Sequence, residues 1–283
     1  MKSLFLLFLL LPAPLWLLTG GPAQEGSPSD GKPKGHLVLI GGGRRTPAVM
    51  GRFLALAGGK GARIAVLPMA SRRYRQAGES YRKEFQELGA AFVKVLIAKD
   101  RKATEDPDLA GSLMACTGLF IGGGDQRRLA ELFVGTGFGR AVRAFHRRGG
   151  VVGGTSAGAA VMSRVMITGE GDWTRPRLGG VATREGLGLV QGAVIDQHFY
   201  ARKRFNRLLA LCLEKKLPGV GIDEATALWV KGSGEAQVLG EGVVLVIDPR
   251  KAVLPEKRKK GDPLQARDVR LHVLRRGERF EMP

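Results

Sequence analysis

The sequence has few of the residues that build metal sites and disulfide frameworks. Only two cysteines and four histidines occur in 283 residues. Cys116 and Cys212 lie inside apolar stretches, so we expect two buried free thiols rather than a disulfide. No spaced cluster of cysteine and histidine is present, so the sequence predicts no metal site and no other cofactor.

Acidic and aromatic side chains are also scarce. The chain has 26 Asp and Glu against 45 Lys and Arg, which gives a formal net charge of +19, and aromatic residues make up 6%. Such a charge attracts polyanions over long range. However, no nucleic-acid recognition motif accompanies it, and side chains that could stack on bases are few. We therefore interpret the charge as basic solvated surface and predict no specific nucleic-acid partner.

A long apolar run occurs at the N-terminus. Residues 4–18 are apolar, with two prolines among them, and they follow the positively charged Lys2. The small residues that end at Ala23 form a plausible cleavage site. This pattern predicts a signal peptide over residues 1–23 and hence export to the periplasm or outside the cell. An uncleaved membrane anchor is the alternative. Residues 24–34 are rich in Gly, Pro, Ser and Lys, which predicts a disordered leader.

From residue 35 onward, apolar β-rich runs alternate with helical patterns. Strands are predicted at residues 37–40, 64–67, 92–97, 119–121 and 151–152, and helices at 48–57, 80–88, 127–133 and 139–148. This order predicts a flavodoxin-like α/β fold with a mostly parallel sheet and helices on both faces. Shorter antiparallel strands are expected in the C-terminal third, at 227–230, 237–239, 243–247 and 269–274. We expect residues 35–283 to form a single domain.

The segment 154–158 has the G-x-S-x-G form of a nucleophile elbow. In such an elbow a strand delivers a serine, here Ser156, onto a strained turn that needs small neighbours. The following helix directs free backbone N–H groups, that of Ala157 first, toward an oxyanion at the serine. The alternative is a glycine-rich strand-to-helix turn with an ordinary serine.

A serine nucleophile needs a base and a group that orients the base. His198 is the candidate base because it ends an apolar strand next to two polar residues, Asp196 and Gln197. Two acids follow another short apolar strand, so Glu224 or Asp223 could accept the imidazole N–H. A structural histidine and a surface acid pair are the alternatives.

A glycine-rich loop follows the predicted strand at 119–121. Backbone amides of Gly123 and Gly124 can approach a substrate carbonyl, and Gln126 can hydrogen-bond a peptide group. In open α/β sheets, ligands bind at the carboxyl ends of the strands. Together with the elbow, this loop therefore supplies a candidate oxyanion hole.

Taken in order, these motifs resemble the serine peptidase family that contains cyanophycinases and aspartyl dipeptidases and has the fold of class I glutamine amidotransferases. The matching pieces are residues 154–159, residues 123–126, residues 196–199 with Arg202, Arg204, Arg207 and Leu208, and residues 221–224 with Thr226 and Ala227. Weaker similarity extends over nearly all of the mature chain.

The resemblance implies that Ser156 is the nucleophile, His198 the base and Glu224 the orienting acid. It also implies a substrate pocket lined by Gln126, Gln197, Arg202, Arg204 and Arg207. The family's polymer, cyanophycin, is a polyaspartate whose side chains carry arginine through isopeptide bonds, and the product is the β-Asp-Arg dipeptide.

A terminal β-Asp-Arg unit presents two free carboxylates, which guanidinium groups bind in bidentate fashion. For the three arginines to converge, Arg202 must lie in the loop before the helix that carries the other two. Guanidinium groups of the substrate need acidic partners, for which Asp196, Glu170 and Asp172 are the candidates.

We therefore expect an exported serine peptidase that hydrolyses cyanophycin or a related polymer through an acyl-enzyme. The alternatives are an aspartyl dipeptidase-like enzyme acting on other acidic peptides and a non-catalytic, secreted, basic binding module. An α/β-hydrolase esterase is disfavoured, because its triad order would require Asp248 and His272 after the serine. The expected partner is a peptide polymer, with no stable membrane anchor, and a homodimer is allowed for.

Overall fold

The computed structural model describes residues 33–171 and 174–283. In chain order the elements are β1 (Leu37–Ile40), α1 (Pro47–Leu56), β2 (Arg63–Leu67), α2 (Tyr74–Glu87), β3 (Phe92–Val95), α3 (Pro107–Met114), β4 (Gly118–Ile121), α4 (Gln126–Phe133), α5 (Gly137–Arg147), β5 (Val151–Thr155), α6 (Ala157–Ala160), β6 (Val165–Ile167), β7 (Thr183–Glu185), β8 (Val194–Gln197), α7 (Phe205–Lys215), β9 (Gly219–Ile222), β10 (Thr226–Val230), β11 (Glu235–Gly240), β12 (Val243–Asp248), β13 (Arg270–Arg275) and β14 (Arg279–Glu281). The predicted signal peptide and nearly all of the predicted leader lie outside the described residues. Within the described part, no helix has the length and apolar character needed to cross a membrane.

The main sheet has the strand order β14-β11-β10-β1-β5-β4-β2-β3. Its five strands from β1 to β3 pair in parallel, whereas β10, β11 and β14 pair antiparallel. Strands β1, β4 and β5 are buried along their whole length, as expected of parallel strands covered on both faces. The predicted fold class, with antiparallel strands in the C-terminal third, is confirmed.

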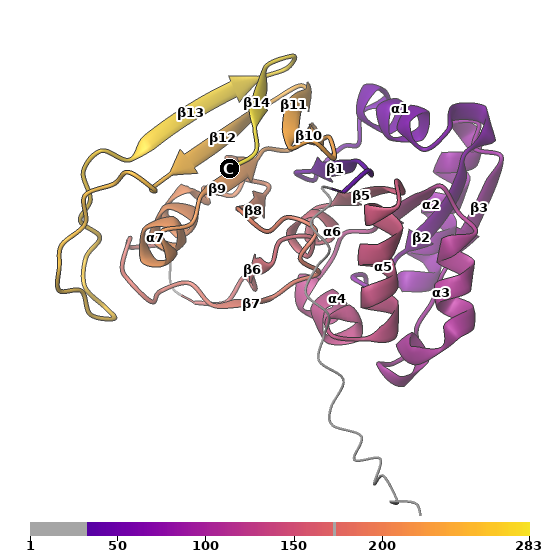
Figure 1. Ribbon diagram of the computed structural model, residues 1–283, viewed down its shortest axis with the longest axis horizontal. Coiled ribbons are helices and arrows are strands. Elements are labelled where there is room, and N and C mark those ends of the chain that lie inside the picture. Colours follow the sequence, from indigo (N-terminus) through magenta and orange to yellow (C-terminus); the bar gives the residue numbers. More distant parts are fainter. Residues whose placement is uncertain (1–32, 172–173) are drawn as a thin grey trace, which may run out of the picture. The chain divides into compact units, whose positions relative to one another are not determined.

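Helices cover both faces of the main sheet (Figure 1). Alternation along β1 shows how: Val38 and Ile40 pack against α1 and α2, while Leu37 and Leu39 belong to the core that includes α3, α4 and α5. Side chains on successive strand residues point to opposite faces, so one apolar run supplies both cores.

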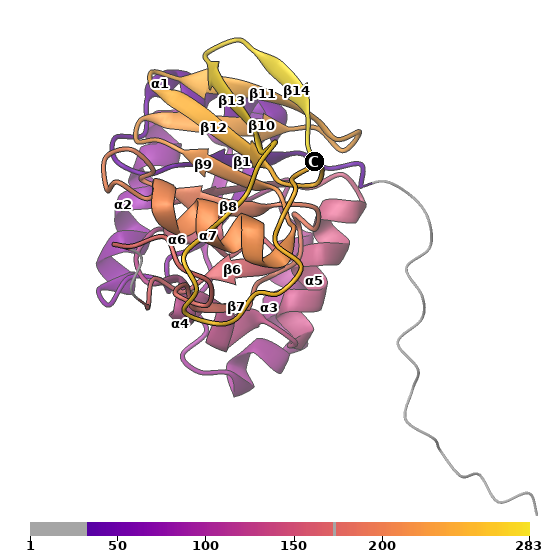
Figure 2. The same cartoon turned by 90° about the vertical axis from the view of Figure 1, so that its left-hand side faces the viewer.

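A second sheet, β13-β12-β9-β8, was not foreseen as separate from the first. Strands β8 and β9 are parallel, and α7 packs on one face of this sheet in a core that contains Phe199, Leu208 and Ile247. Figure 2 views the molecule with α7 in front of these strands. Both cysteines are free and buried, as predicted, and Cys212 lies in this core.

Element boundaries differ from the prediction mainly where the sequence is highly charged. Helix α2 begins at Tyr74 rather than at residue 80. Only Gly78, Tyr81 and Phe85 of this helix are buried, so the sequence of its first turn has no apolar pattern that would indicate the start. Helix α3 was missed, although Asp106 caps it and Pro107 occupies its first turn, which is a typical start signal.

The carboxyl ends of both sheets meet through the loop after β1. The N–H of His198, after β8, donates to Gly41 O at 2.7 Å, and the N–H of Ala225 donates to Gly42 O at 3.0 Å. The N–H of Gly41 in turn donates to Thr226 O at 2.9 Å. These bonds bring the strand ends of β1, β8 and β9 to one place, and the Ser156 N–H, after β5, joins them by donating to Ile40 O at 2.9 Å.

Candidate active site

Ser156 stands at a strained turn between β5 and α6. Its backbone has φ 54° and ψ −115°, a conformation that non-glycine residues rarely adopt. Such a conformation costs on the order of 1–3 kcal/mol and persists only where the surroundings impose it. Gly154 and Gly158 allow the close packing around this turn, because a Cβ on Gly158 would lie 2.1 Å from Ile121 O and one on Gly154 would lie 2.6 Å from the Gly158 backbone.

The structure brings Ser156, His198 and Glu224 together. His198 Nε2 lies 2.9 Å from Ser156 Oγ, and His198 Nδ1 lies 2.5 Å from Glu224 Oε1. Of the two acids left open by the sequence, Glu224 is therefore the one at the imidazole. The His198 side chain is 9% exposed and that of Glu224 41% exposed, so the serine–histidine contact is shielded while the acid is at the surface.

Glycines of the loop after β1 make room for this arrangement, and the sequence interpretation did not assign them to the site. A Cβ on Gly42 would lie 2.3 Å from His198 Cε1, and one on Gly43 would lie 2.9 Å from Glu224 Cβ. Both glycines have positive φ, so a larger residue would be strained as well as crowded. The signal that could have found them is the run of three glycines directly after a buried strand.

The loop of Gly123 and Gly124 lies beside the serine. A Cβ on Gly123 would lie 3.4 Å from Ser156 Cβ, and one on Gly124 would lie 2.2 Å from Ala70 O. The N–H of Gly123 donates to Tyr81 Oη at 3.3 Å, a contact that no sequence pattern indicated. The N–H of Ala157 is the first of α6, so it has no partner within the helix and is available to an oxyanion.

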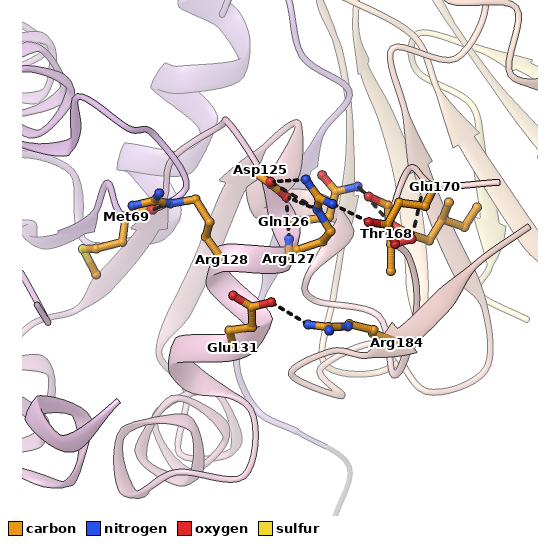
Figure 3. Close-up of polar contacts among 10 residues, drawn as sticks. Met69, Asp125, Gln126, Arg127, Arg128, Glu131, Thr168, Glu170 and Arg184 are labelled. Atoms are coloured by element: carbon orange, nitrogen blue, oxygen red, sulfur yellow. Dashed lines mark hydrogen bonds and ion pairs between the residues drawn. The ribbon is translucent and has the colours of Figure 1, made fainter. Parts of the chain in front are cut away.

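In the structure, the Gln126 side chain hydrogen-bonds backbone carbonyls of the protein instead of facing an open pocket. Its amide nitrogen donates to Ile167 O at 2.9 Å and to Thr168 O at 3.0 Å, and the residue is 8% exposed. Next to it Arg127 joins Asp125 and Glu170, at 2.8 and 2.5 Å (Figure 3). The start of α4 is thereby tied to the segment that follows β6.

Further along α4, Glu131 pairs with Arg184 of β7 at 2.7 Å (Figure 3). Both side chains are half exposed, and ion pairs of this kind contribute little to stability. The pair links the β6–β7 hairpin to α4 at a second place.

Arg207 and Asp196 form a buried ion pair, which differs from the expectation that both contact substrate. Each side chain is 1% exposed, and Arg207 Nε donates to Asp196 Oδ2 at 2.7 Å while its Nη2 contacts Oδ1. The Gln197 N–H also donates to Asp196 Oδ1, at 2.8 Å. Loss of one partner from a buried pair costs about 3–5 kcal/mol, because the other charge stays buried. We therefore regard this pair as a support for β8 and α7.

The other three residues expected in the substrate pocket, Gln197, Arg202 and Arg204, lie near the triad and differ in their contacts and exposure. Gln197 Oε1 lies 3.4 Å from Ser156 Oγ, a longer contact than the one to His198. Arg204 Nη1 donates to Gln197 O at 2.7 Å, and its side chain is 12% exposed. Arg202 is exposed and lies in the turn before α7, which is the position that convergence of the arginines required.

The pKa of His198 is lowered from its ordinary value of 6.5, chiefly by burial and further by the charges of Arg202 and Arg204. The hydrogen bond and charge of Glu224 oppose this shift. A lowered pKa keeps the imidazole neutral over a wider pH range, which is the state a general base requires.

We expect kcat/KM to rise with pH through a midpoint below 6.5 and then to level, because the free enzyme's histidine must lose its proton. Arg202→Gln removes a positive charge near His198, so its midpoint should move to higher pH. Lys60→Gln, an exposed site at the opposite edge of the sheet, should leave the midpoint unchanged. The check is a kcat/KM–pH profile for the three proteins. Coincident midpoints in wild type and Arg202→Gln would show that Arg202 does not act on His198.

No group of three or more metal-ligating side chains occurs among residues 33–171 and 174–283. The arrangement at Ser156 is one that acyl transfer needs: a hydroxyl, a neutral base in contact with it, and an acid that orients the base.

The chain matches peptidase family S51 over residues 37–238. It is 37% identical to the cyanophycinase of Trichormus variabilis over 238 residues, which cover 83% of this chain and 80% of that protein. The cyanophycinase of Geminocystis herdmanii is 37% identical over 254 residues, 87% of this chain and 93% of its own.

Solved structures share the fold. A peptidase from an acI-B1 Actinobacterium superposes with a TM-score of 0.65 at 24% identity, covering 89% of this chain and 98% of that one. A putative peptidase E protein from Listeria monocytogenes gives a TM-score of 0.54 at 17% identity, covering 74% of this chain and 99% of that one. From the family match and the identity to cyanophycinases, the chain belongs to peptidase family S51 and is a serine-type peptidase.

Proposed function

We propose that this peptidase hydrolyses cyanophycin, or a closely related β-aspartyl-arginine polymer, to β-Asp-Arg dipeptides, with Ser156, His198 and Glu224 as its catalytic triad. The observation that carries the proposal is the continuous contact from Ser156 Oγ through His198 to Glu224, at 2.9 and 2.5 Å. The relatives named cyanophycinases supply the substrate class.

The chemistry follows from these contacts. Release of an intact β-Asp-Arg unit means that the backbone amide between two aspartates is cleaved while the isopeptide bond stays. Ser156 Oγ attacks the carbonyl carbon of that amide, and His198 Nε2 takes the hydroxyl proton. When the C–N bond breaks, the imidazolium returns the proton to the leaving amine, and an ester to Ser156 remains. Water then attacks the ester and gives one proton to His198. When the ester C–O bond breaks, the imidazolium returns that proton to Ser156 Oγ, and the carboxylic acid is released.

Glu224 accepts a hydrogen bond from His198 Nδ1 and so holds Nε2 toward the serine, while its charge stabilises the imidazolium. The oxyanion of the tetrahedral intermediate is stabilised by backbone N–H groups, for which we propose Ala157 together with Gly123 and Gly124. Since the Gly123 N–H contacts Tyr81 Oη at 3.3 Å, a long hydrogen bond, a developing negative charge competes well for it.

Substrate carboxylates are assigned to Arg202 and Arg204 in this proposal. Arg202 is exposed in the turn directly after the catalytic histidine, and Arg204 retains donors beyond the one bound to Gln197 O. Arg207 instead holds Asp196 and thereby the end of β8. A guanidinium binds a carboxylate through two parallel hydrogen bonds, which suits the free carboxylates at the end of the polymer.

Export is part of the proposal and rests on the sequence alone. The apolar run at residues 4–18 behind Lys2 is typical of a signal peptide. The mature protein is then expected to begin near Gln24.

The test of the proposed activity is incubation of the full chain with insoluble cyanophycin, followed by mass analysis of the soluble products. We expect β-Asp-Arg as the main product, together with a mass consistent with an intact isopeptide bond. Free arginine with an unchanged polyaspartate backbone would show cleavage of the wrong bond. Turnover of other acidic peptides but not of the polymer would favour an aspartyl dipeptidase-like enzyme, and capture without turnover would favour a binding module.

A further inference from the structure

A polymer of β-Asp-Arg places a guanidinium beside the scissile bond, and this basic protein has few carboxylates to receive it. Three carboxylates near the triad already have cationic or imidazole partners: Asp196 holds Arg207, Glu170 holds Arg127, and Glu224 holds His198. Asp172, a candidate from the sequence, lies outside the described residues. The two described acids among those expected from the sequence, Asp196 and Glu170, are therefore already occupied by arginines of the protein.

Asp223 is differently placed. It follows β9 directly, adjoins Glu224 in the chain, and is partly exposed. Its carboxylate accepts a hydrogen bond from the Ala201 N–H at 3.3 Å, so it faces the turn that leads from His198 to α7. Among the ion pairs of the described residues, none includes Asp223. Its negative charge thus remains available beside the triad.

Tyr200 lies in the same turn, two residues after the catalytic histidine. Its ring rests edge-on against Phe199, with centroids 5.4 Å apart at 84°, while Phe199 is buried. Tyr200 itself is 43% exposed, so much of the side chain faces solvent. Burial and the charge of Asp223 both raise the pKa of the Tyr200 hydroxyl, which agrees with the carboxylate being close to this ring.

An exposed aromatic ring next to an unpaired carboxylate is a receptor for a planar cation. The face of a tyrosine ring attracts a guanidinium stacked on it, and a carboxylate accepts two of its N–H groups. We propose that Tyr200 and Asp223 form the subsite that binds the arginine side chain of the substrate. This inference rests on the proposed function, because it places the arginine of the same polymer beside the same serine.

The proposed subsite and the two arginines of the following turn bind different parts of the substrate. Arg202 and Arg204 present positive charge toward the carboxylates of a β-Asp-Arg unit, and Asp223 presents negative charge toward its other end. This arrangement gives a reason for specificity toward arginine in a protein with a net charge of +19, since the general field of such a protein repels a guanidinium.

The experiment compares two soluble substrates, a dimer of β-Asp-Arg and the same dimer with citrulline in place of arginine. Citrulline keeps the shape of the side chain and removes its charge. Asp223→Asn should lower kcat/KM for the arginine dimer about ten- to a hundredfold, the range for loss of a charge-assisted hydrogen bond. It should leave kcat/KM for the citrulline dimer within about twofold of wild type.

Tyr200 gives an independent measurement. Tyr200→Leu should lower kcat/KM for the arginine dimer about three- to fivefold, as expected for loss of an exposed cation–π contact. Tyr200→Phe should retain most of the activity, because the ring remains. Glu87→Gln, which removes one exposed negative charge at the end of α2, is the matched control and should change neither substrate.

The outcomes separate the subsite from the proposed function. Wild-type enzyme that cleaves neither dimer nor polymer would overturn the proposed function and the subsite with it. Wild-type enzyme that cleaves both dimers equally well would overturn the subsite alone. Equal losses on both dimers in Asp223→Asn would also overturn it, since they would show that Asp223 acts through Glu224 or the turn rather than on the guanidinium.

Discussion

Ser156→Ala is expected to abolish hydrolysis of cyanophycin, with kcat/KM reduced by on the order of 10³-fold or more. The reason is that no other hydroxyl of the described site lies in contact with His198, whose Nε2 is 2.9 Å from Ser156 Oγ. The substitution removes one oxygen and leaves the glycines that shape the elbow, so the fold should persist. Product release from the insoluble polymer, measured by mass, and circular dichroism of the variant check both parts.

A matched control for this change is Ser80→Ala on the exposed side of α2, which should leave hydrolysis unchanged. Substantial turnover by Ser156→Ala would remove the covalent mechanism. The acyl-enzyme can also be sought directly, because an activated ester or organophosphonate should label wild type at Ser156 and leave the Ser156→Ala variant unlabelled.

His198→Ala should be nearly as damaging as loss of the serine, because groups that act as a unit do not contribute additively. Glu224→Gln should cost less, about 10²- to 10⁴-fold, since an amide can hold the ring but cannot stabilise the imidazolium with a charge. Both losses should appear equally on the arginine and the citrulline dimers, because the triad acts on the scissile amide and not on the side chain.

The comparison of the two neighbouring acids is decisive for the triad. On the citrulline dimer, Asp223→Asn should leave kcat/KM close to wild type whereas Glu224→Gln should lower it strongly. The opposite ranking on this substrate would mean that Asp223 orients the histidine in the working enzyme, in spite of the 2.5 Å contact between His198 and Glu224.

The sequence by itself determined the α/β class and the positions of the chemical groups along the chain. Continuous apolar runs marked β1, β4 and β5, because strands of a parallel sheet are buried on both faces. The glycines around Ser156 marked the elbow, because only small residues fit where a strand turns sharply into a helix. Local pattern was sufficient in these cases since the constraint acts within a few residues.

The tertiary structure alone decided how these groups meet. Asp223 and Glu224 are adjacent and chemically alike, and only the folded chain distinguishes them: Glu224 contacts the imidazole, whereas Asp223 accepts a hydrogen bond from the Ala201 N–H. Arg204 and Arg207 are alike in sequence as well, yet Arg204 donates to Gln197 O whereas Arg207 is fully buried in its ion pair with Asp196. Which charges pair and which side chains are buried depend on the segments of the chain that pack together. Composition and spacing could therefore identify the candidate residues. Their contacts were decided by the packing of the two sheets at Gly41 and Gly42.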